Sequence, residues 1–349
     1  MLIIMICPSC GSEDCIRPLE YVLDRASSIY APCGKCRNAA PLDKTAPFNE
    51  LGLTFGIDAK RCPSCGKRHM DHIMAHALEI LIKNKKKGKS SALKDTGTPL
   101  IEYGVPLLEP PRLGSRSLIL VTDNVDKKTA GQIIDQVPEI KGILKRSENP
   151  SKSVGLLDTD RKPYLYELMA GCDMRADLVS SMLGDLLFYR NQSEMHIEFR
   201  RNDSIKIKMI EKLFLEGMLE GKVVVDGLAS VGTLGLFAAL SGAKKVVLND
   251  AWLPAVRNIL INIDVNSSAL GVRMERTCEL EGLPQIAGVP VLVAKASGNV
   301  EIEVYHGDLR KLDGPVPSCD ICIIDTFPGV SNEVFLRKWE KLSGRVLTL

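Results

Sequence analysis

Residues 223–250 read V-V-V-D-G-L-A-S-V-G-T-L-G-L-F-A-A-L-S-G-A-K-K-V-V-L-N-D, and this stretch decides the fold. A β-branched run ends on Asp226, a turn follows through Gly227 and Gly232, and an apolar helix leads to a second β-branched run that ends on Asp250. The order of strand, glycine turn, helix and strand predicts an α/β fold with a nucleotide-type site. Glycines let backbone N–H groups approach a ligand, and a strand-end carboxylate can accept two hydrogen bonds from a ribose diol.

The acid at the end of the first strand separates the candidate cofactors. In the dinucleotide fingerprint a pyrophosphate rests on the helix N-terminus, whereas Asp226 would repel phosphate at that place. S-adenosylmethionine carries a cationic amino group, has an adenosine whose ribose Asp250 can hold, and contains no phosphate. The residues therefore favour S-adenosylmethionine. The competing interpretation is a doubly wound domain that binds nothing or binds another nucleotide.

The sequence D-G-L-A-S-V-G-T-L-G at residues 226–235, followed by L-N-D at residues 248–250, resembles the class I S-adenosylmethionine-dependent methyltransferases. It is particularly similar to the tRNA guanine-N2 dimethyltransferases, whose loop has the form D-A-L-S-A-T-G-x-R-G followed by N-D. The resemblance implies a Rossmann-like methyltransferase sheet and a set of cofactor contacts. These implied contacts come from Asp226, Gly227, Gly232, Asp250, Trp252 and, after the third strand, Asp308.

Residues 320–329, D-I-C-I-I-D-T-F-P-G, read as the fourth strand and the loop that follows it. Ligands of an open α/β sheet lie outside the carboxyl ends of its strands, so Asp325 is expected to face the transferred methyl group. The corresponding loop of N-methyltransferases is D-P-F-G or N-P-P-Y, and here the proline and the aromatic residue are transposed. The resemblance implies that Asp325 orients or deprotonates the target amine and that Phe327 stacks on the base. The alternative is a strand-end acid beside a core phenylalanine.

Residues 331–341 predict one more helix and residues 345–349 one more strand. A complete methyltransferase sheet normally has two further strands. The resemblance therefore implies a sheet that lacks its last two strands, or one whose edge is covered by the amino-terminal domains, because an exposed apolar edge invites aggregation. We assign residues 216–349 to this α/β methyltransferase domain.

The middle segment, residues 96–215, predicts a small α+β domain. Strands are expected at residues 117–121 and 140–145, with a helix at 126–136 that Asp126 caps. A longer helix is expected within residues 164–187, and a strand at residues 195–199. The arrangement loosely resembles the domain that precedes the catalytic fold in archaeal tRNA guanine-N1 and wybutosine-type methyltransferases, which implies a role in recognising RNA.

Six of the eleven cysteines form three C-x-x-C pairs within residues 1–95. In a C-P-x-C-G turn two thiolates converge on one ion, and the trailing glycine lets the chain fold back. Two such knuckles separated by a hairpin make a zinc ribbon, and four thiolates leave no open position for catalysis. We therefore expect a zinc-ribbon region with one or two structural Zn²⁺ ions. The expected ligands are Cys7, Cys10, Cys33, Cys36, Cys62 and Cys65.

Two pairings of these knuckles remain open. In one, the first and second pairs share an ion, and the third pair takes His69 and His72. In the other, the second and third pairs share an ion, and the first pair takes Cys15 or a histidine. The remaining cysteines are scattered, and Cys319 and Cys322 are expected to be small buried hydrophobes.

The composition is that of an ordinary globular protein, with 45% hydrophobic residues, 25% charged residues and a net charge of +2. Nothing marks the whole chain as a polyanion binder, but residues 1–95 hold fifteen Lys and Arg against ten Asp and Glu. A helix is expected at residues 70–83, and the stretch N-K-K-K-G-K-S-S at residues 84–91 that ends it reads as an exposed linker that could touch phosphate. Residues 1–6 are too short for a signal peptide or a membrane span and read as a strand, so a cytoplasmic protein without membrane contact is expected.

Together these features predict an S-adenosylmethionine-dependent methyltransferase that acts on a nitrogen of a base in RNA, with guanine in tRNA as the first candidate. One rival is a methyltransferase that acts on a protein or a small molecule, because the cofactor motifs say nothing about the acceptor. The other is a non-catalytic, zinc-containing module that binds RNA or protein on a degenerate fold.

Overall fold

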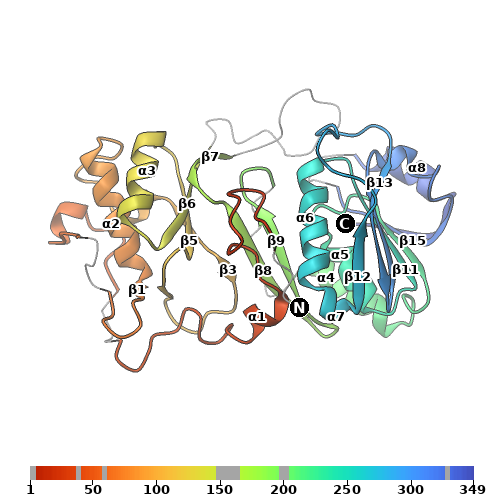
Figure 1. The fold of residues 1–349 in the computed structure, drawn as a ribbon, viewed down its shortest axis with the longest axis horizontal. Helices are drawn as coiled ribbons and strands as arrows, with labels where there is room; N and C mark the ends of the chain where they lie inside the picture. The colour runs from red at the N-terminus through yellow and green to blue at the C-terminus, as the bar shows by residue number, and fades with distance from the viewer. Residues whose placement is uncertain (1–4, 37–40, 57–60, 147–165, 196–203, 327–330) are drawn as a thin grey trace.

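The computed structural model describes residues 5–36, 41–56, 61–146, 166–195, 204–326 and 331–349. The described residues form four sheets, and the three larger ones follow one another along the long axis of the molecule, with helices packed beside them (Figure 1). The amino-terminal segments lie against the first two sheets, and the third sheet occupies the opposite end (Figure 1). Among the described helices, none combines the length and the apolar character that a bilayer span requires.

The carboxyl-terminal sheet has seven strands in the order β12-β13-β14-β11-β10-β15-β16. The five strands from β14 to β16 are parallel, while β13 and β12 continue the sheet as antiparallel strands beyond β14. This arrangement confirms the predicted Rossmann-like α/β sheet, and in the described part of the chain the sheet ends at β16. The strands are β10 (Val223–Asp226), β11 (Lys245–Asp250), β12 (Val272–Arg276), β13 (Val291–Gly298), β14 (Glu301–His306), β15 (Cys319–Ile324) and β16 (Ser343–Thr348).

Helices cover both faces of this sheet because side chains alternate along each strand. Val224 and Val246 point into the larger core, which the helices before and between the first strands complete. Val225 and Val247 point into a second core, which Cys322 and the fully buried Trp339 complete. The helices on the first face are α4 (Ile205–Leu215), α5 (Thr233–Leu240), α6 (Leu253–Val265) and α7 (Ser267–Leu270), and those on the second are η3 (Leu309–Lys311) and α8 (Glu333–Trp339).

The middle of the chain forms a four-stranded sheet, β2-β5-β6-β7, and a three-stranded sheet, β3-β8-β9. The helix predicted at residues 126–136 is confirmed as α3 (Lys127–Gln136), and Asp126 caps it by accepting from the Thr129 N–H at 2.8 Å. The predicted strands are confirmed as β5 and β6. The strands are β2 (Thr98–Ile101), β3 (Tyr103–Gly104), β5 (Leu118–Thr122), β6 (Ile140–Arg146), β7 (Tyr166–Gly171), β8 (Met174–Ser181) and β9 (Gly184–Asn191).

The helix predicted within residues 164–187 is wrong, because the described residues there form β7, β8 and the start of β9. Gly171 and Gly184 have φ angles of 78° and 129°, which interrupt the chain at each turn. The first five residues of β8 are buried, since this strand lies between β3 and β9. Burial within a sheet therefore outweighs the helical spacing of the apolar residues. The strand expected at residues 195–199 is not formed at Met195, and residues 196–199 lie outside the described part.

The amino-terminal region contains little regular structure before its main helix. That helix, α2 (Met70–Lys83), matches its prediction, and the His69 side chain caps it by accepting from the Asp71 N–H. The expected first strand is not formed at Met5 and Ile6, and residues 1–4 are outside the described ranges. In residues 5–36, 41–56 and 61–67 no hairpin strands separate the knuckles. The short elements are α1 (Leu19–Leu23), η1 (Phe48–Glu50), β1 (Arg68–His69), η2 (Leu93–Thr96) and β4 (Arg112–Leu113).

Helix α6 is joined to the free edge of β9 by asparagine side chains one turn apart. Asn262 accepts from the Tyr189 N–H at 2.7 Å and donates to the Tyr189 carbonyl at 3.1 Å. Asn266 repeats the pattern with Leu187, at 2.8 and 2.7 Å. Both asparagines are completely buried. The two amides therefore replace the partner strand that this edge lacks, and they fix the middle sheet against the seven-stranded sheet.

Candidate functional site

Eight cysteine sulfurs form two separate clusters. Within each cluster all four sulfur atoms lie within 4.8 Å of one another. Centre A contains Cys7, Cys10, Cys15 and Cys172; centre B contains Cys33, Cys36, Cys62 and Cys65. The second of the two open pairings is therefore the one found, and His69 and His72 belong to neither cluster.

The two C-P-S-C-G knuckles have the same backbone geometry. The Gly11 N–H donates to the Cys7 carbonyl at 2.8 Å, and the Gly66 N–H donates to the Cys62 carbonyl at 2.8 Å. Both glycines have positive φ angles, 72° and 68°, which side-chain-bearing residues rarely adopt. The trailing glycines thus let each turn close on its own thiols, as the sequence predicts.

The sulfur geometry fits a single tetrahedral ion at each centre. Sulfur–sulfur distances are 3.4 Å from Cys10 to Cys15 and 3.7 Å from Cys15 to Cys172 in centre A. In centre B they run from 3.5 to 3.7 Å. A tetrahedron with metal–sulfur bonds of about 2.3 Å has edges of about 3.8 Å. All eleven cysteines are free of disulfide bonds, so the eight thiols can act as ligands.

Three acids lie at the carboxyl ends of adjacent parallel strands. Asp226 ends β10, Asp250 ends the neighbouring β11, and Asp325 directly follows β15 on the other side of β10. The negative charges of Asp250 and Asp325 both help to raise the pKa of Asp226. The structure thus brings together the three acids that the sequence predicts at this edge.

The loop after β10 is shaped by its glycines and by one strained residue. Gly232 has a φ of 86° and precedes α5, and Ser230 has a φ of 52°, a left-handed conformation that is rare for serine. A Cβ on Gly227 would come within 2.6 Å of Leu309, and one on Gly235 within 2.2 Å of Leu248. Side chains are therefore excluded at two points where the loop and α5 approach their neighbours.

The Asp226 side chain is buried and forms a hydrogen bond with the start of α5, next to this loop. The carboxylate is 1% exposed, and its Oδ2 accepts from the Gly235 N–H in the first turn of α5 at 2.9 Å. Burial raises the pKa of Asp226 to about 7. In this geometry Asp226 orients the glycine loop and the start of α5.

Asp250 is held at the mouth of the loop by two backbone groups. Its Oδ2 accepts from the Ser230 N–H and its Oδ1 from the Trp252 N–H, both at 2.9 Å. Loss of hydration raises the pKa of Asp250 to about 6. Each oxygen keeps a second lone pair, so the carboxylate can still accept two hydroxyl hydrogens.

Two further residues that are predicted to contact the cofactor, Trp252 and Asp308, make side-chain hydrogen bonds within the protein. The Trp252 indole is buried, and its Nε1 donates to the Glu194 carbonyl at 2.9 Å. Asp308 caps η3, and the Arg310 side chain donates to both of its oxygens, at 2.8 and 3.0 Å from Nε. Their cofactor roles remain predictions.

Asp325 forms an ion pair with Lys206 in the first turn of α4. The Asp325 side chain is 20% exposed and the Lys206 side chain 45%, so the pair borders solvent. Lys206 was not among the predicted site residues, because nothing in the spacing of residues 206 and 325 indicates that they meet. Phe327 lies outside the described residues.

Neither models of known protein families nor curated protein sequences match this chain. Solved structures that it resembles include the M. jannaschii tRNA m1G37 methyltransferase, at 16% identity over 79% of this chain and 63% of that one, with a TM-score of 0.38. A Pyrococcus abyssi tRNA (uracil-54, C5)-methyltransferase is 14% identical over 82% and 57%, with a TM-score of 0.37. The T. thermophilus 16S rRNA N2 G1207 methyltransferase is 12% identical over 64% and 61%, with a TM-score of 0.37. All three act on RNA, and the match covers less than two thirds of each; likeness at this level carries no argument about activity.

Proposed function

We propose that this protein is an S-adenosylmethionine-dependent methyltransferase that acts on a ring or exocyclic nitrogen of a base in RNA, with guanine in tRNA as the substrate. The observation that supports the proposal is the row of Asp226, Asp250 and Asp325 at adjacent strand ends beside a glycine loop. Ligands of parallel α/β sheets bind at this edge. In this proposal residues 1–95 and 96–215 present the RNA to residues 216–349.

The strand-end residues fit this cofactor better than a phosphate-bearing one. Asp250 has two free lone pairs for a ribose diol, and three carboxylates at one edge would repel phosphate. When bound, the cofactor supplies an electrophilic methyl group on a positively charged sulfur. Asp325 would accept a hydrogen bond from the N–H of the target amine and then take its proton, and Phe327 would stack on the base.

We also propose that centres A and B each hold one structural Zn²⁺. Four thiolates at tetrahedral spacing leave no open coordination position, so the ions would stabilise the fold without taking part in methyl transfer.

The direct test is calorimetric titration of the purified protein with S-adenosylmethionine and with S-adenosylhomocysteine, followed by incubation with methyl-labelled cofactor and total RNA. We expect binding of both compounds and label in the tRNA fraction. Label in protein or in a small molecule would show that the methyl acceptor is not RNA and would favour the rival function. Failure to bind either compound would favour a non-catalytic zinc-containing module.

Cofactor affinity is expected to depend on pH through Asp250. Because its pKa is raised to about 6, the carboxylate is ionised above that pH and becomes protonated as the pH falls through it. The protonated acid loses acceptor capacity, so the dissociation constant should rise about tenfold per pH unit below pH 6. Calorimetry between pH 5 and pH 8, run alongside an Asp250→Asn variant, measures this. A wild-type profile as flat as that of the variant would remove Asp250 from the ribose contact.

A basic surface at the other end of the molecule supports an RNA partner. The Lys86 side chain pairs with Asp126, and the Asn124 amide donates to the Lys86 carbonyl at 3.1 Å, so the linker at residues 84–91 lies beside the first turn of α3. The lysines gathered there have no ion-pair partner among the described residues. This basic surface consists of Lys85, Lys87, Lys89, Lys127 and Lys128.

Removing two lysines of the basic surface should weaken RNA binding in a salt-dependent way. We expect Lys85→Ala with Lys89→Ala to reduce the slope of log affinity against log salt by about 1.5, because each lost phosphate contact removes about 0.7–0.9. Fluorescence anisotropy with bulk tRNA at several salt concentrations measures the slope. The matched control is Lys244→Ala with Lys341→Ala, which removes the same charge from exposed positions in the seven-stranded sheet domain. Equal slopes for both double variants would exclude the basic surface from RNA binding.

A further inference from the structure

Centre A joins parts of the chain that are far apart in sequence. Three of its cysteines lie within residues 7–15, while Cys172 lies between β7 and β8. Ser9, inside the first knuckle, donates its hydroxyl hydrogen to Asp173, the residue after Cys172. The amino-terminal knuckle and the middle sheets are therefore in contact through both the sulfurs and this hydrogen bond.

Two facing glycines place Cys172 against β6. Gly142 and Gly171 are directly opposite each other in the β6–β7 pair. A Cβ on Gly142 would come within 2.1 Å of the Cys172 carbonyl oxygen, and one on Gly171 within 2.2 Å of the Lys141 carbonyl oxygen. The Cys172 N–H donates to that Lys141 carbonyl at 2.7 Å. The fourth thiol of centre A is thus positioned by the backbone itself.

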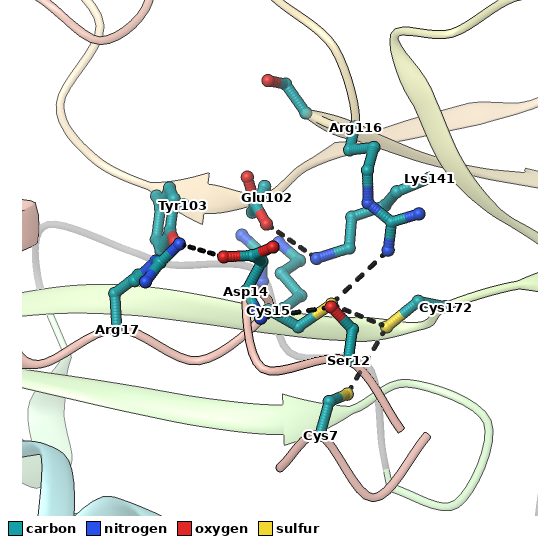
Figure 2. A network of polar contacts seen from close by, with 12 residues as sticks. Cys7, Ser12, Asp14, Cys15, Arg17, Glu102, Tyr103, Arg116, Lys141 and Cys172 are labelled. Carbon is teal, nitrogen blue, oxygen red and sulfur yellow. Dashed lines mark hydrogen bonds and ion pairs between the residues drawn. The ribbon is translucent and has the colours of Figure 1, made fainter. Parts of the chain in front are cut away.

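Two cationic side chains approach the sulfurs of centre A (Figure 2). Arg116 Nη2 lies 3.5 Å from the Cys15 sulfur and donates to it, and the Arg116 backbone has a φ of 57°, in the left-handed region. The Lys141 side chain is completely buried and donates to the Glu102 carboxylate at 2.7 Å. The charge of Lys141 is balanced by Glu102, whereas the strained backbone of Arg116 requires a compensating interaction, which an anionic metal centre beside its guanidinium supplies.

The expected charge of a metal-bound centre explains why a cation lies beside the sulfurs. A divalent ion with four thiolates carries a net charge of about −2, so nearby cations and hydrogen-bond donors stabilise it. A cation gains more from a negatively charged metal–thiolate centre than from neutral thiols. The surroundings of centre A are therefore matched to the metal-bound form.

Centre B has different surroundings. Centre A has three ligands that are at most 2% exposed, Cys7, Cys15 and Cys172, and one exposed ligand, Cys10; in centre B only Cys62 is buried, and the other three ligands are partly exposed. At centre B the hydrogen bond to a sulfur comes from the backbone, from the Cys33 N–H to the Cys36 sulfur at 3.3 Å. Its four ligands also lie within one stretch of residues 33–65.

We propose that centre A is a charge-compensated metal site with three buried ligands, in which Cys172 is the fourth ligand and Arg116 is the counter-cation. Its ion exchanges much more slowly than the ion of centre B. The inference rests on the proposal that both centres bind metal. Thiolates that receive hydrogen bonds and face cations are weaker nucleophiles, and the burial of three of the four sulfurs limits access by chelators and thiol reagents.

The test is the rate at which the metal leaves the full-length protein. Elemental analysis should find two zinc ions per chain. The protein is then treated with excess EDTA and a thiol-modifying reagent, and zinc release is measured with a zinc-sensitive dye. We expect two phases of zinc release with equal amplitude and rates that differ at least tenfold. If the wild-type protein contained no metal, the proposal that the two centres bind metal would be refuted. If both ions were released at one rate, the proposal that centre A exchanges its ion more slowly would be overturned. Neither readout needs RNA or S-adenosylmethionine, so methyltransferase activity is tested separately.

Single substitutions assign each phase of zinc release to one of the two centres. Cys172→Ser should leave one ion and only the fast phase, and Cys65→Ser only the slow phase; the reverse assignment would overturn the proposal. Arg116→Met keeps all eight thiols and should speed the slow phase at least threefold with two ions still bound. Its control is Arg146→Met, which removes a half-exposed cation paired with Asp123 and should change neither phase. An Arg116→Met protein with an unchanged slow phase would remove Arg116 as a counter-cation.

Discussion

An Asp325→Asn variant is expected to transfer methyl groups about a thousandfold more slowly than the wild-type protein, while its affinity for S-adenosylmethionine stays within threefold. Asparagine keeps the size of the side chain but cannot take a proton, and a positioned proton acceptor contributes about 10²–10⁴ in rate. In the proposed function Asp325, which follows β15, lies at the edge where the acceptor would bind, and Asp226 and Asp250 lie on the cofactor side. Single-turnover transfer from labelled cofactor to tRNA measures the rate, and calorimetry measures the affinity.

The matched control for Asp325 lies on the same strand. Asp320→Asn changes an acid at the other end of β15, where it accepts from the Val223 N–H at 2.8 Å and pairs with Lys222. We expect turnover within twofold of wild type for this control. If Asp325→Asn retained full turnover, Asp325 would have no part in the reaction and its pairing with Lys206 would be structural.

Asn262→Ala is expected to lower the free energy of unfolding by about 4 kcal/mol. The substitution leaves the Tyr189 N–H, the Tyr189 carbonyl and the Val231 carbonyl without the partner that Asn262 provides. Each buried polar group that loses its partner costs about 1–3 kcal/mol. Urea unfolding followed by circular dichroism measures the change from the shift in the transition midpoint.

A surface asparagine provides the comparison for Asn262. Asn124→Ala removes one exposed side-chain bond, to the Lys86 carbonyl, and should change stability by less than about 1 kcal/mol, as exposed hydrogen bonds usually contribute little. An equally small loss in Asn262→Ala would show that the edge of β9 is held by something other than the asparagines of α6.

Local pattern is sufficient to predict the carboxyl-terminal sheet and the positions of its strand-end acids. β-Branched runs that end on Asp226 and Asp250 predict parallel strands, and parallel strands place their ends at one edge of a sheet. The helix beginning at Met70 and the cap at Asp126 follow from spacing and capping chemistry in the same way. Each of these predictions depends on residues that are close together in the sequence.

The parts that sequence reasoning missed depend on contacts between distant residues. Cys172 has no second cysteine nearby in the sequence, so only the packing of β7 and β8 beside the first knuckle reveals it as a member of centre A. Lys206 and Asp325 are brought together by the packing of α4 on the sheet. The apolar spacing of residues 164–187 predicts a helix but is also compatible with strands, and the neighbouring strands decide the outcome.

The long separation between Cys15 and Cys172 affects the chain while the ribosome is still making it. At roughly 5–20 residues per second, Cys172 is added about 8–30 seconds after Cys15, whereas the last ligand of centre B follows its first within about 2–6 seconds. During that interval the nascent chain displays three thiols without their partner. A metal ion captured then would keep one coordination position open to foreign thiols until the second half of the middle sheet emerges. Synthesis of residues 16–172 is therefore the period in which this protein is most exposed to mispairing and oxidation.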